Sequence, residues 1–348
     1  MRRGRLAGLA GPAARSSRAR CRRYQEVIKQ SEPGMPTAST AAPHTAMLHL
    51  SPEDRSRLAG LNRCWNDNIV KHRAEVLEIY APLVRRADTA GIEVLREIGY
   101  GADPRQRLDV FVPQGARKRR VLIFVHGGAF TRGSKSADGV FYDNVAYWFA
   151  SQGFVAVNVE YRLAPAAPFP AGAQDVGLAV DWVAKNITAH GGDPGDLVLM
   201  GHSAGGCHVA SYLLDPLAWD APRAGIAAAV LVSARLRLEC LPSNPNAANV
   251  AAYCGSDPAV LERCSPVNHV ERCRWPVFVA VAEHENRHLD SYGLKFAARL
   301  TTTCGRAPRV VQMHGHNHSS IVAHFNSGED ELGCEILAFV ATRKGPPQ

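Results

Sequence analysis

The sequence predicts an α/β fold with a mostly parallel central sheet and helices on both faces. Short, nearly continuous apolar runs rich in β-branched residues recur from residue 108 onward, as expected for strands buried on both faces. Amphipathic stretches lie between these runs, and strands that alternate with helices favour parallel pairing. The predicted strands are residues 108–112, 121–125, 154–160, 197–200, 226–232, 277–282 and 309–313, and the predicted helices are residues 137–151, 173–189, 205–214, 290–302 and 330–342.

The segment ahead of the first predicted strand is expected to be helical. Residues 51–84 carry apolar side chains at roughly helical spacing, and Ser51 and Pro52 suit the N-cap and the first helical position. We expect one or two helices that form a small N-terminal cover over a cleft. Residues 234–275 are rich in Pro, Asn and Cys and lack a strong period, which predicts an irregular excursion over the sheet near the substrate.

The positive net charge comes from the start of the sequence. The 348 residues have a formal net charge of +8, but residues 1–23 hold eight of the 40 basic residues and no acidic one. The other 32 basic residues match the 32 acidic ones, so the rest of the chain is neutral overall. This balance argues against a nucleic acid partner, which would require a basic patch on the folded part.

The first residues have the composition of an organellar transit peptide, because they are rich in Arg, Ala and Ser and lack acids. The alternative is that translation begins at Met35 or Met47 and that the leader is an upstream extension. Either interpretation places the leader outside the fold, as a disordered or targeting segment. The predicted division is a leader (residues 1–46) and one folded domain (residues 47–348), in which residues 47–100 are the helical cover and residues 101–348 the core.

The cysteine pattern and the hydropathy limit the cellular setting. The nine cysteines are an odd number without a C-x-x-C pair, which favours reduced thiols over a disulfide framework or a cysteine zinc site. No apolar run approaches the roughly 18 residues that a membrane-spanning helix needs. We expect a cytoplasmic protein, with organellar import as the alternative if the leader is a targeting signal. The sequence leaves open whether the chain forms a homodimer.

A predicted strand, a Gly-rich motif and a predicted helix follow one another at residues 197–214. The motif is GHSAGG, between LVLM and CHVASYLL. A G-x-S-x-G match between a strand and a helix is typical of the nucleophile elbow, in which glycines allow a tight turn and the serine projects at the carboxyl edge of the sheet. The following helix directs its positive dipole end toward this point. Ser203 is therefore the predicted nucleophile, and the alternative is a serine that only caps the helix.

A second Gly-rich segment, HGGAF, follows the strand predicted at residues 121–125. Backbone N–H groups in such a segment can point into a cleft without bulky side chains in the way. The predicted oxyanion hole consists of the N–H groups of Gly128, Ala129 and Ala204. Gly127 leaves room beside these groups, and His126 is expected to be structural. The alternative for this segment is a plain β-turn.

Three ordered segments resemble a known family. HGGAF, EYRLAPAAPFPAGAQD and GGDPGDLVLMGHSAGG look like the α/β-hydrolase fold, in its hormone-sensitive-lipase-like and arylformamidase-like esterase branches. The resemblance covers about residues 108–342. It implies a serine carboxylesterase or amidase with a catalytic triad in the order Ser, acid, His, and it implies no metal and no cofactor.

The sequence departs from the family pattern at two positions. Ala129 stands where lipase-like members usually carry a third glycine, so the N–H is kept and a methyl group is added to the acyl site. Phe130 stands where arylformamidases usually carry Trp, which argues against a formamidase. We regard Phe130 and Gly127 as candidates for the wall of the substrate pocket.

The family's acid follows the next-to-last strand, where VFVAVAEHENRHLD offers three carboxylates. We prefer Glu285, because it lies three residues past the predicted strand end, in a loop that can face the cleft, and matches the family's acid position. Asp290 begins a helical run and is interpreted as an N-cap. Glu283 is interpreted as structural.

Four histidines lie in MHGHNHSSIVAHF, near the end of the sequence. GHNH follows the last predicted strand and matches the family's G-x-x-H, which makes His318 the predicted base. The other three are expected to be loop or packing neighbours, namely His314, His316 and His324. The alternative is a metal site, because an extended segment would direct the histidines at 314, 316 and 318 to one face, and three imidazoles can bind zinc.

The predicted function is a serine hydrolase that cleaves carboxylic esters of small or medium substrates through an acyl-enzyme. Ser203 is the nucleophile, Glu285 the acid and His318 the base. An aryl formamidase or amidase of the kynurenine formamidase type is the first alternative, and a metal-dependent hydrolase using the His314 to His318 cluster is the second. A binding-only protein on this scaffold is disfavoured, because all three triad residues are present. The expected partner is a small-molecule ester or amide, without a cofactor.

Overall fold

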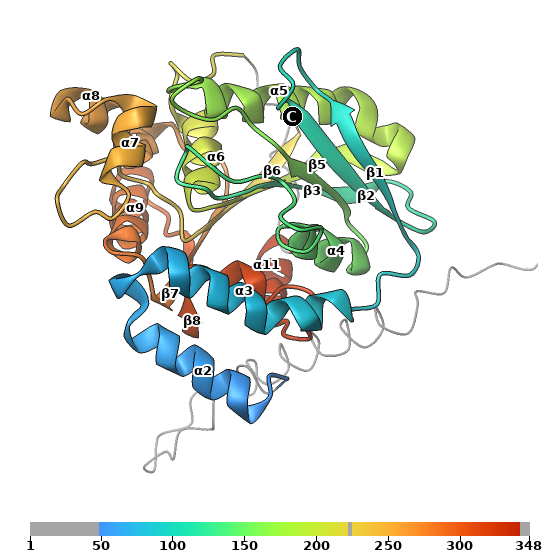
Figure 1. Cartoon of the computed structure of the whole chain (residues 1–348). Helices are drawn as coiled ribbons and strands as arrows, with labels where there is room; N and C mark the ends of the chain where they lie inside the picture. Colours follow the sequence, from blue (N-terminus) through green and yellow to red (C-terminus); the bar gives the residue numbers. More distant parts are fainter. Residues whose placement is uncertain (1–48, 222–224, 342–348) are drawn as a thin grey trace, which may run out of the picture.

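The central feature of the computed structural model is one eight-stranded sheet (Figure 1). The structure describes residues 49–221 and 225–341. The strand order is β1-β2-β4-β3-β5-β6-β7-β8, with β1 antiparallel to β2, β2 antiparallel to β4, and all other neighbours parallel. The strands are β1 (Ile92–Gly99), β2 (Arg107–Pro113), β3 (Arg119–Val125), β4 (Val155–Val159), β5 (Gly192–His202), β6 (Ile226–Val232), β7 (Val277–His284) and β8 (Arg309–Asn317).

The structure confirms the predicted α/β class and all seven predicted strands. Strand β1 was missed, because its sequence IEVLREIG leaves most side chains partly or fully exposed and contains no apolar run. The prediction that the last strand ends near Met313 is wrong, since β8 continues to Asn317. His314 and His316 therefore belong to the strand and not to a loop.

Helices cover both faces of the sheet. One apolar layer joins the sheet to α5 (Ala171–Asn186), α6 (Ala204–Leu214) and α9 (Leu289–Cys304). The opposite layer joins it to α4 (Asp143–Ser151) and α11 (Glu331–Ala341). Because the parallel strands end at a common edge between these layers, the loops that follow β3, β5, β7 and β8 lie together.

The N-terminal cover is helical, as predicted. It consists of α2 (Pro52–Arg63), the 3₁₀ turn η1 (Trp65–Asp67) and α3 (Ile69–Arg85). The Ser51 side chain accepts a hydrogen bond from the Asp54 N–H at 3.0 Å, which is the expected N-cap. A separate apolar cluster joins α2 and α3 to Phe141 and Ala323, and Figure 1 shows both helices (blue) crossing beside the ends of β7 and β8.

The stretch expected to be irregular contains short helices. They are α7 (Ala247–Cys254), α8 (Pro258–Arg263) and the 3₁₀ segment η3 (Pro266–Arg272). The sequence prediction missed them because each helix has at most eight residues, which is too short for a clear period. The remaining short elements are the 3₁₀ turn η2 (Ile187–His190) and α10 (Ser320–Ala323).

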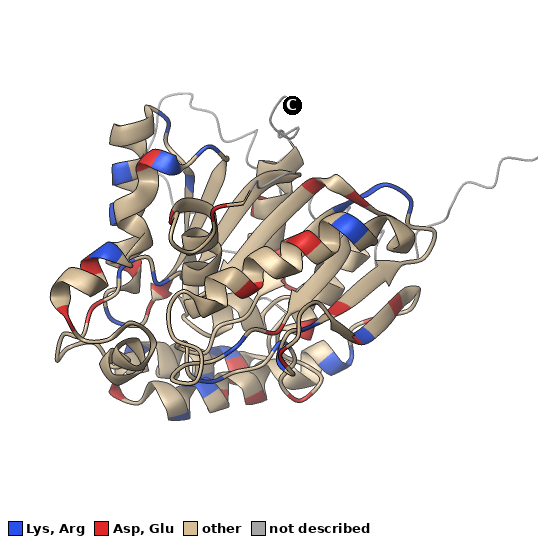
Figure 2. Ribbon diagram, turned by 90° about the horizontal axis from the view of Figure 1, so that it is seen from above, with Lys and Arg blue, Asp and Glu red and all other residues tan. Residues whose placement is uncertain are grey.

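Charge and cysteine patterns are partly as expected. Figure 2 shows basic and acidic residues interspersed along the same helices, without a basic face in this view. Seven cysteines of the described ranges are free thiols, as expected, whereas Cys334 is disulfide-bonded and departs from the expected reduced thiols. In residues 49–221 and 225–341, no helix has the length and apolar character needed to cross a bilayer. The predicted leader lies outside the described residues.

Candidate active site

Ser203 lies in a strained turn between a strand and a helix. Strand β5 ends at His202, Ser203 has φ 56° and ψ −118°, and α6 begins at Ala204. This backbone conformation is costly for a residue with a side chain and is typical of sites that hold a reacting group. A Cβ atom added at Gly205 would lie 2.2 Å from a carbonyl oxygen of β3, so only glycine lets the helix approach the sheet here.

A chain of hydrogen bonds links Ser203, His318 and Glu285. The Nε2 atom of His318 lies 3.0 Å from Ser203 Oγ, and its Nδ1 atom lies 2.5 Å from Glu285 Oε1. His318 directly follows β8 and Glu285 directly follows β7, so both side chains come from loops at the carboxyl edge of the sheet. Since Glu285 accepts at Nδ1, His318 presents its other nitrogen to the serine hydroxyl.

The Glu285 carboxylate is buried and satisfied by donors. It accepts hydrogen bonds from the N–H groups of Ala282 at 3.2 Å and Asn286 at 3.0 Å. Burial by itself would raise its pKa, but the nearby His318 imidazole and these donors outweigh burial and lower the pKa of Glu285 below its ordinary value. The carboxylate is therefore ionised at neutral pH.

The other two candidate acids lie elsewhere. Glu283 accepts from the Gly315 N–H at 2.7 Å and contacts His314 Nδ1 at 2.8 Å, so it binds the end of β8. Asp290 lies in the first turn of α9. The N-cap of this helix is His288, so the prediction of Asp290 as N-cap is wrong. Neither carboxylate contacts His318.

The histidines at 314, 316 and 318 do not converge. His314 is exposed beside Glu283, whereas His316 is buried with its Nε2 atom 2.7 Å from Glu329 Oε1. Gly315 has φ 72° and interrupts the pairing register of β8 with β7, which turns its two neighbours to different sides. The alternative of a metal site, which required an extended segment to align them on one face, is therefore contradicted. In the ranges 49–221 and 225–341, no group of three or more His, Cys, Asp or Glu side chains is arranged to bind a metal ion.

The fourth histidine of this segment also packs inside. His324 is fully buried against Phe325, and its Nδ1 atom lies 3.0 Å from the carbonyl oxygen of Ser320. Burial lowers the pKa of His324 to about 4. The ring is therefore neutral at neutral pH, as suits a packing residue.

The HGGAF segment leaves backbone donors free. Gly128 has φ 152° and Ala129 has φ 50°, and both border the cavity beside Ser203. The N–H groups of Gly128, Ala129 and Ala204 donate to no acceptor in the described part of the chain. A Cβ atom at Gly127 would lie 2.8 Å from the His202 ring and 3.1 Å from Ser203 Cβ, so this glycine leaves room as predicted.

The side chains that flank this segment are structural. His126 is fully buried, stacks on Tyr161 with ring centres 4.3 Å apart and lies 3.1 Å from Glu160 Oε1. Phe130 is buried and stacks on Tyr253 at 4.2 Å, in an apolar cluster behind the site. Gly127 borders the cavity, but Phe130 does not, and its expected place in the pocket wall is corrected to a packing role.

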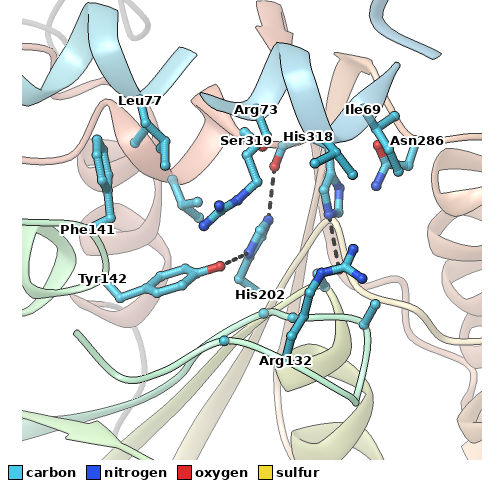
Figure 3. A pocket seen from close by; sticks show the side chains of 18 of the residues that line it. Ile69, Arg73, Leu77, Arg132, Phe141, Tyr142, His202, Asn286, His318 and Ser319 are labelled. Carbon is cyan, nitrogen blue, oxygen red and sulfur yellow. Dashed lines mark hydrogen bonds between the residues drawn. The ribbon is translucent and has the colours of Figure 1, made fainter. Parts of the chain in front are cut away.

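A cavity of about 270 Å³ opens in front of Ser203 and His318 (Figure 3). The cover supplies one wall, through Trp65, Ile69, Val70, Arg73 and Leu77. The opposite wall comes from the HGGAF loop and from Tyr142, and only Asn246 comes from the excursion at residues 234–275. The expected cover over a cleft is present, whereas the expected contribution of the excursion is small.

The sequence analysis missed His202, which borders the cavity next to His318, with ring centres 4.8 Å apart. Its Nε2 atom donates to the His318 carbonyl oxygen at 3.0 Å, and its Nδ1 atom lies 3.4 Å from the Tyr142 hydroxyl. Because a carbonyl only accepts, Nε2 carries the proton and Nδ1 accepts from Tyr142. Burial lowers the pKa of His202 well below its ordinary value, so the ring stays neutral. The only signal in the sequence was its place inside the G-x-S-x-G motif.

Several solved structures that this chain matches are esterases. A hyperthermophilic esterase from Pyrobaculum calidifontis aligns with a TM-score of 0.63 and 26% identity, over 84% of this chain and 97% of that one. The chain has the α/β-hydrolase fold. A bacterial heroin esterase aligns with a TM-score of 0.63 at 23% identity, over 84% of this chain and 97% of that one, which supports the same fold.

Sequence relatives place this α/β-hydrolase beside esterases. The BD-FAE family model matches residues 108–214. Esterase LipC of Mycobacterium tuberculosis is 38% identical over 113 residues, which are 32% of this chain and 27% of that protein. Gut esterase 1 of Caenorhabditis elegans is 29% identical over 188 residues, which are 51% of this chain and 30% of that protein. The matches thus span less than a third of either relative.

Proposed function

We propose that this α/β-hydrolase is a serine carboxylesterase that acts through an acyl-enzyme. The observation that carries the proposal is the hydrogen-bonded series Ser203, His318 and Glu285 at the wall of a cavity. A serine hydroxyl is a weak nucleophile at neutral pH, and an adjacent imidazole that accepts its proton activates it. The esterase names of the relatives and structural neighbours support the same reaction.

In the proposed acylation step, His318 Nε2 takes the hydroxyl proton as Ser203 Oγ bonds to the ester carbonyl carbon. Glu285 stabilises the imidazolium that forms and holds its tautomer. The carbonyl oxygen gains the electron pair, and the free N–H groups of the predicted hole bind it, namely those of Gly128, Ala129 and Ala204. The intermediate collapses, the alcohol leaves with the proton from His318, and the acyl group stays on Ser203.

Deacylation repeats the same steps with water. His318 takes a proton from a water molecule that attacks the acyl carbon, and the second tetrahedral intermediate expels Ser203 Oγ, which regains its proton. The product is a carboxylic acid. The cavity of about 270 Å³ suits a small ester, because ligand sites typically start at roughly 300 Å³.

Replacing the nucleophile tests the proposal directly. Ser203→Ala is expected to reduce kcat for 4-nitrophenyl butyrate by at least about 10⁴-fold with an unchanged circular dichroism spectrum. Ser291→Ala, in α9 and outside the cavity wall, is the control and should retain activity. An organophosphate should add one phosphoryl group to the parent protein, which peptide mass spectrometry would locate at Ser203. Parent-level turnover by Ser203→Ala would refute the proposal.

A further inference from the structure

In the described part of the chain, two arginines and no carboxylate border the cavity. Arg73 extends from α3 and Arg132 from the loop after the HGGAF segment, and Figure 3 shows both side chains directed into the space near His202 and His318. Among residues 49–221 and 225–341, no Asp and no Glu lines it. The cavity wall therefore carries two permanent positive charges, because guanidinium groups stay protonated at any physiological pH.

The position of Arg73 is unusual for its helix. Ile69, Arg73 and Leu77 are spaced by four residues, so they lie on one face of α3, and all three border the cavity. The rest of that face is apolar, with Val70 beside Ile69. A charge in the middle of an apolar, cavity-facing stripe does not serve packing, which suggests that it serves a ligand.

The acidic residues of α3 do not neutralise Arg73. Glu75 and Glu78 point to α2, where they lie 3.8 and 2.6 Å from the Arg57 guanidinium. Arg73 instead reaches the buried Tyr142 hydroxyl. Burial raises the pKa of this hydroxyl, and the nearby Arg73 guanidinium partly offsets the rise. The Tyr142 hydroxyl contacts the His202 ring, and this ring donates to the His318 carbonyl oxygen. Arg73 is therefore held beside the reacting groups.

Arg132 is fixed relative to the predicted oxyanion hole. Its backbone N–H donates to the Gly128 carbonyl oxygen at 3.1 Å, which closes a turn between the two residues. A Cβ atom at Gly128 would lie 1.7 Å from the Arg132 carbonyl oxygen, so the turn is tightly packed. No carboxylate of the described residues pairs with the Arg132 or the Arg73 side chain, although other arginines, such as Arg96 and Arg162, bind buried aspartates.

We propose that the cavity selects small esters that carry a carboxylate, which Arg73 and Arg132 bind while the ester carbonyl lies at Ser203. The inference rests on the proposed esterase function and specifies its substrate class. Planar guanidinium groups bind carboxylates through paired, charge-assisted hydrogen bonds, which are stronger than hydrogen bonds between neutral groups. An acidic substrate would supply the counter-charge that the cavity wall lacks.

Matched substrate pairs test the selectivity. In the first pair, the anionic ester 4-acetoxybenzoate is compared with its neutral methyl ester, and the charge of the anion lies on the leaving group. In the second pair, the monoanion of 4-nitrophenyl hydrogen adipate is compared with 4-nitrophenyl hexanoate, and the charge of the anion lies on the acyl group. For at least one pair we expect kcat/KM of the parent protein to be about tenfold or more higher for the anion, and this preference should weaken with added salt.

Arginine variants test which residues cause the preference. Arg73→Gln and Arg132→Gln should each lower the ratio of kcat/KM for the anionic over the neutral ester by roughly tenfold, mainly through KM, and the Lys variants should retain part of it. Arg85→Gln is the matched control, because Arg85 lies exposed on the same helix, outside the cavity, and its loss changes the net charge equally. It should leave the ratio unchanged.

A binding measurement separates this inference from the proposed function. Calorimetry with Ser203→Ala should detect adipate, and Arg73→Gln and Arg132→Gln added to that background should weaken adipate binding by about tenfold or more. Equal kcat/KM for anionic and neutral esters, or a ratio that Arg85→Gln lowers as much as the cavity variants do, would overturn the selectivity and leave the esterase intact. Failure of the parent protein to cleave any of the four esters, with adipate still bound through both arginines, would overturn the proposed function alone.

Discussion

At the residue scale, His318 is held on three sides. Its two ring nitrogens contact Ser203 and Glu285, and its backbone carbonyl accepts from the His202 ring. An imidazole restrained in this way keeps one tautomer and one orientation. The sequence analysis could predict Ser203 and His318 from motifs that follow strands, and Glu285 from its place in the loop after the next-to-last strand. It could not assign His202, whose partners lie 60 and 116 positions away in the chain.

The acid assignment gives a prediction at this scale. Glu285→Gln should lower kcat by about 10³- to 10⁴-fold with little change in KM, because the amide no longer stabilises the imidazolium and favours the wrong tautomer. Steady-state kinetics with 4-nitrophenyl butyrate measures this effect. Asp290→Asn, in the first turn of α9, is the control and should change kcat by less than about twofold. An unchanged kcat in Glu285→Gln together with its loss in Asp290→Asn would show that the acid was misassigned.

At the scale of elements, the junction of β3, β5 and α6 depends on close backbone contact. The start of α6 lies directly on the end of β3, which leaves no room for a side chain at Gly205. The cover is attached to the same edge of the sheet by side-chain hydrogen bonds. Asn62 donates to the Gly315 carbonyl oxygen at 2.7 Å, and Asn66 donates to that of Glu285 at 3.0 Å. The cover thus positions Arg73 against loops that carry the reacting groups.

Two glycine substitutions distinguish close contact from helix propensity. Gly205→Ala should reduce the free energy of unfolding by more than about 3 kcal/mol, because its Cβ would lie 2.2 and 2.4 Å from two backbone carbonyl oxygens of the β3 edge. Gly60→Ala, in α2, should instead stabilise by about 0.5–1 kcal/mol, because the nearest atom to its Cβ lies 3.8 Å away. Urea unfolding measures both changes. Equal effects in the two variants would contradict the packing argument.

At the scale of the whole molecule, buried neutral histidines couple folding to pH. Burial lowers the pKa of His324 to about 4 and that of His208 to about 3. In the unfolded chain both would titrate near 6.5. The unfolded state therefore binds more protons as the pH falls below about 6.5, and stability present at neutral pH is lost progressively toward the folded-state pKa values.

This linkage predicts that acid lowers the free energy of unfolding and that replacing His324 reduces this effect. The free energy of unfolding of the parent protein should fall between pH 6.5 and 4, and His324 should contribute on the order of 3 kcal/mol to that fall. His324→Gln should be less stable at pH 7 but lose less stability on acidification. His190→Gln, at a partly exposed site, should keep the parent slope. Urea unfolding at several pH values measures these slopes, and identical slopes for the parent and His324→Gln would contradict the prediction.

The sequence by itself determined the features that depend on local order along the chain. Seven apolar runs specified strands, although the run at residues 309–313 forms the edge strand β8 and is mostly exposed, contrary to the expectation of burial. A strand followed by G-x-S-x-G and a helix specified the turn that carries Ser203. The two Gly-rich segments could be interpreted because glycine is needed where the backbone has positive φ or approaches another backbone closely. These requirements are local and therefore visible in a short window.

Only the tertiary structure decided which distant residues meet. The pairing that makes β1 a strand, the bulge at Gly315 that separates His314 from His316, and the convergence of Arg73 and Arg132 on one cavity all depend on long-range packing. A charged residue in a helix has the same local pattern whether it faces solvent or a ligand, and only the surrounding walls distinguish the two. The physical reason is that charge and burial act through space, whereas sequence patterns report only the nearest neighbours along the chain.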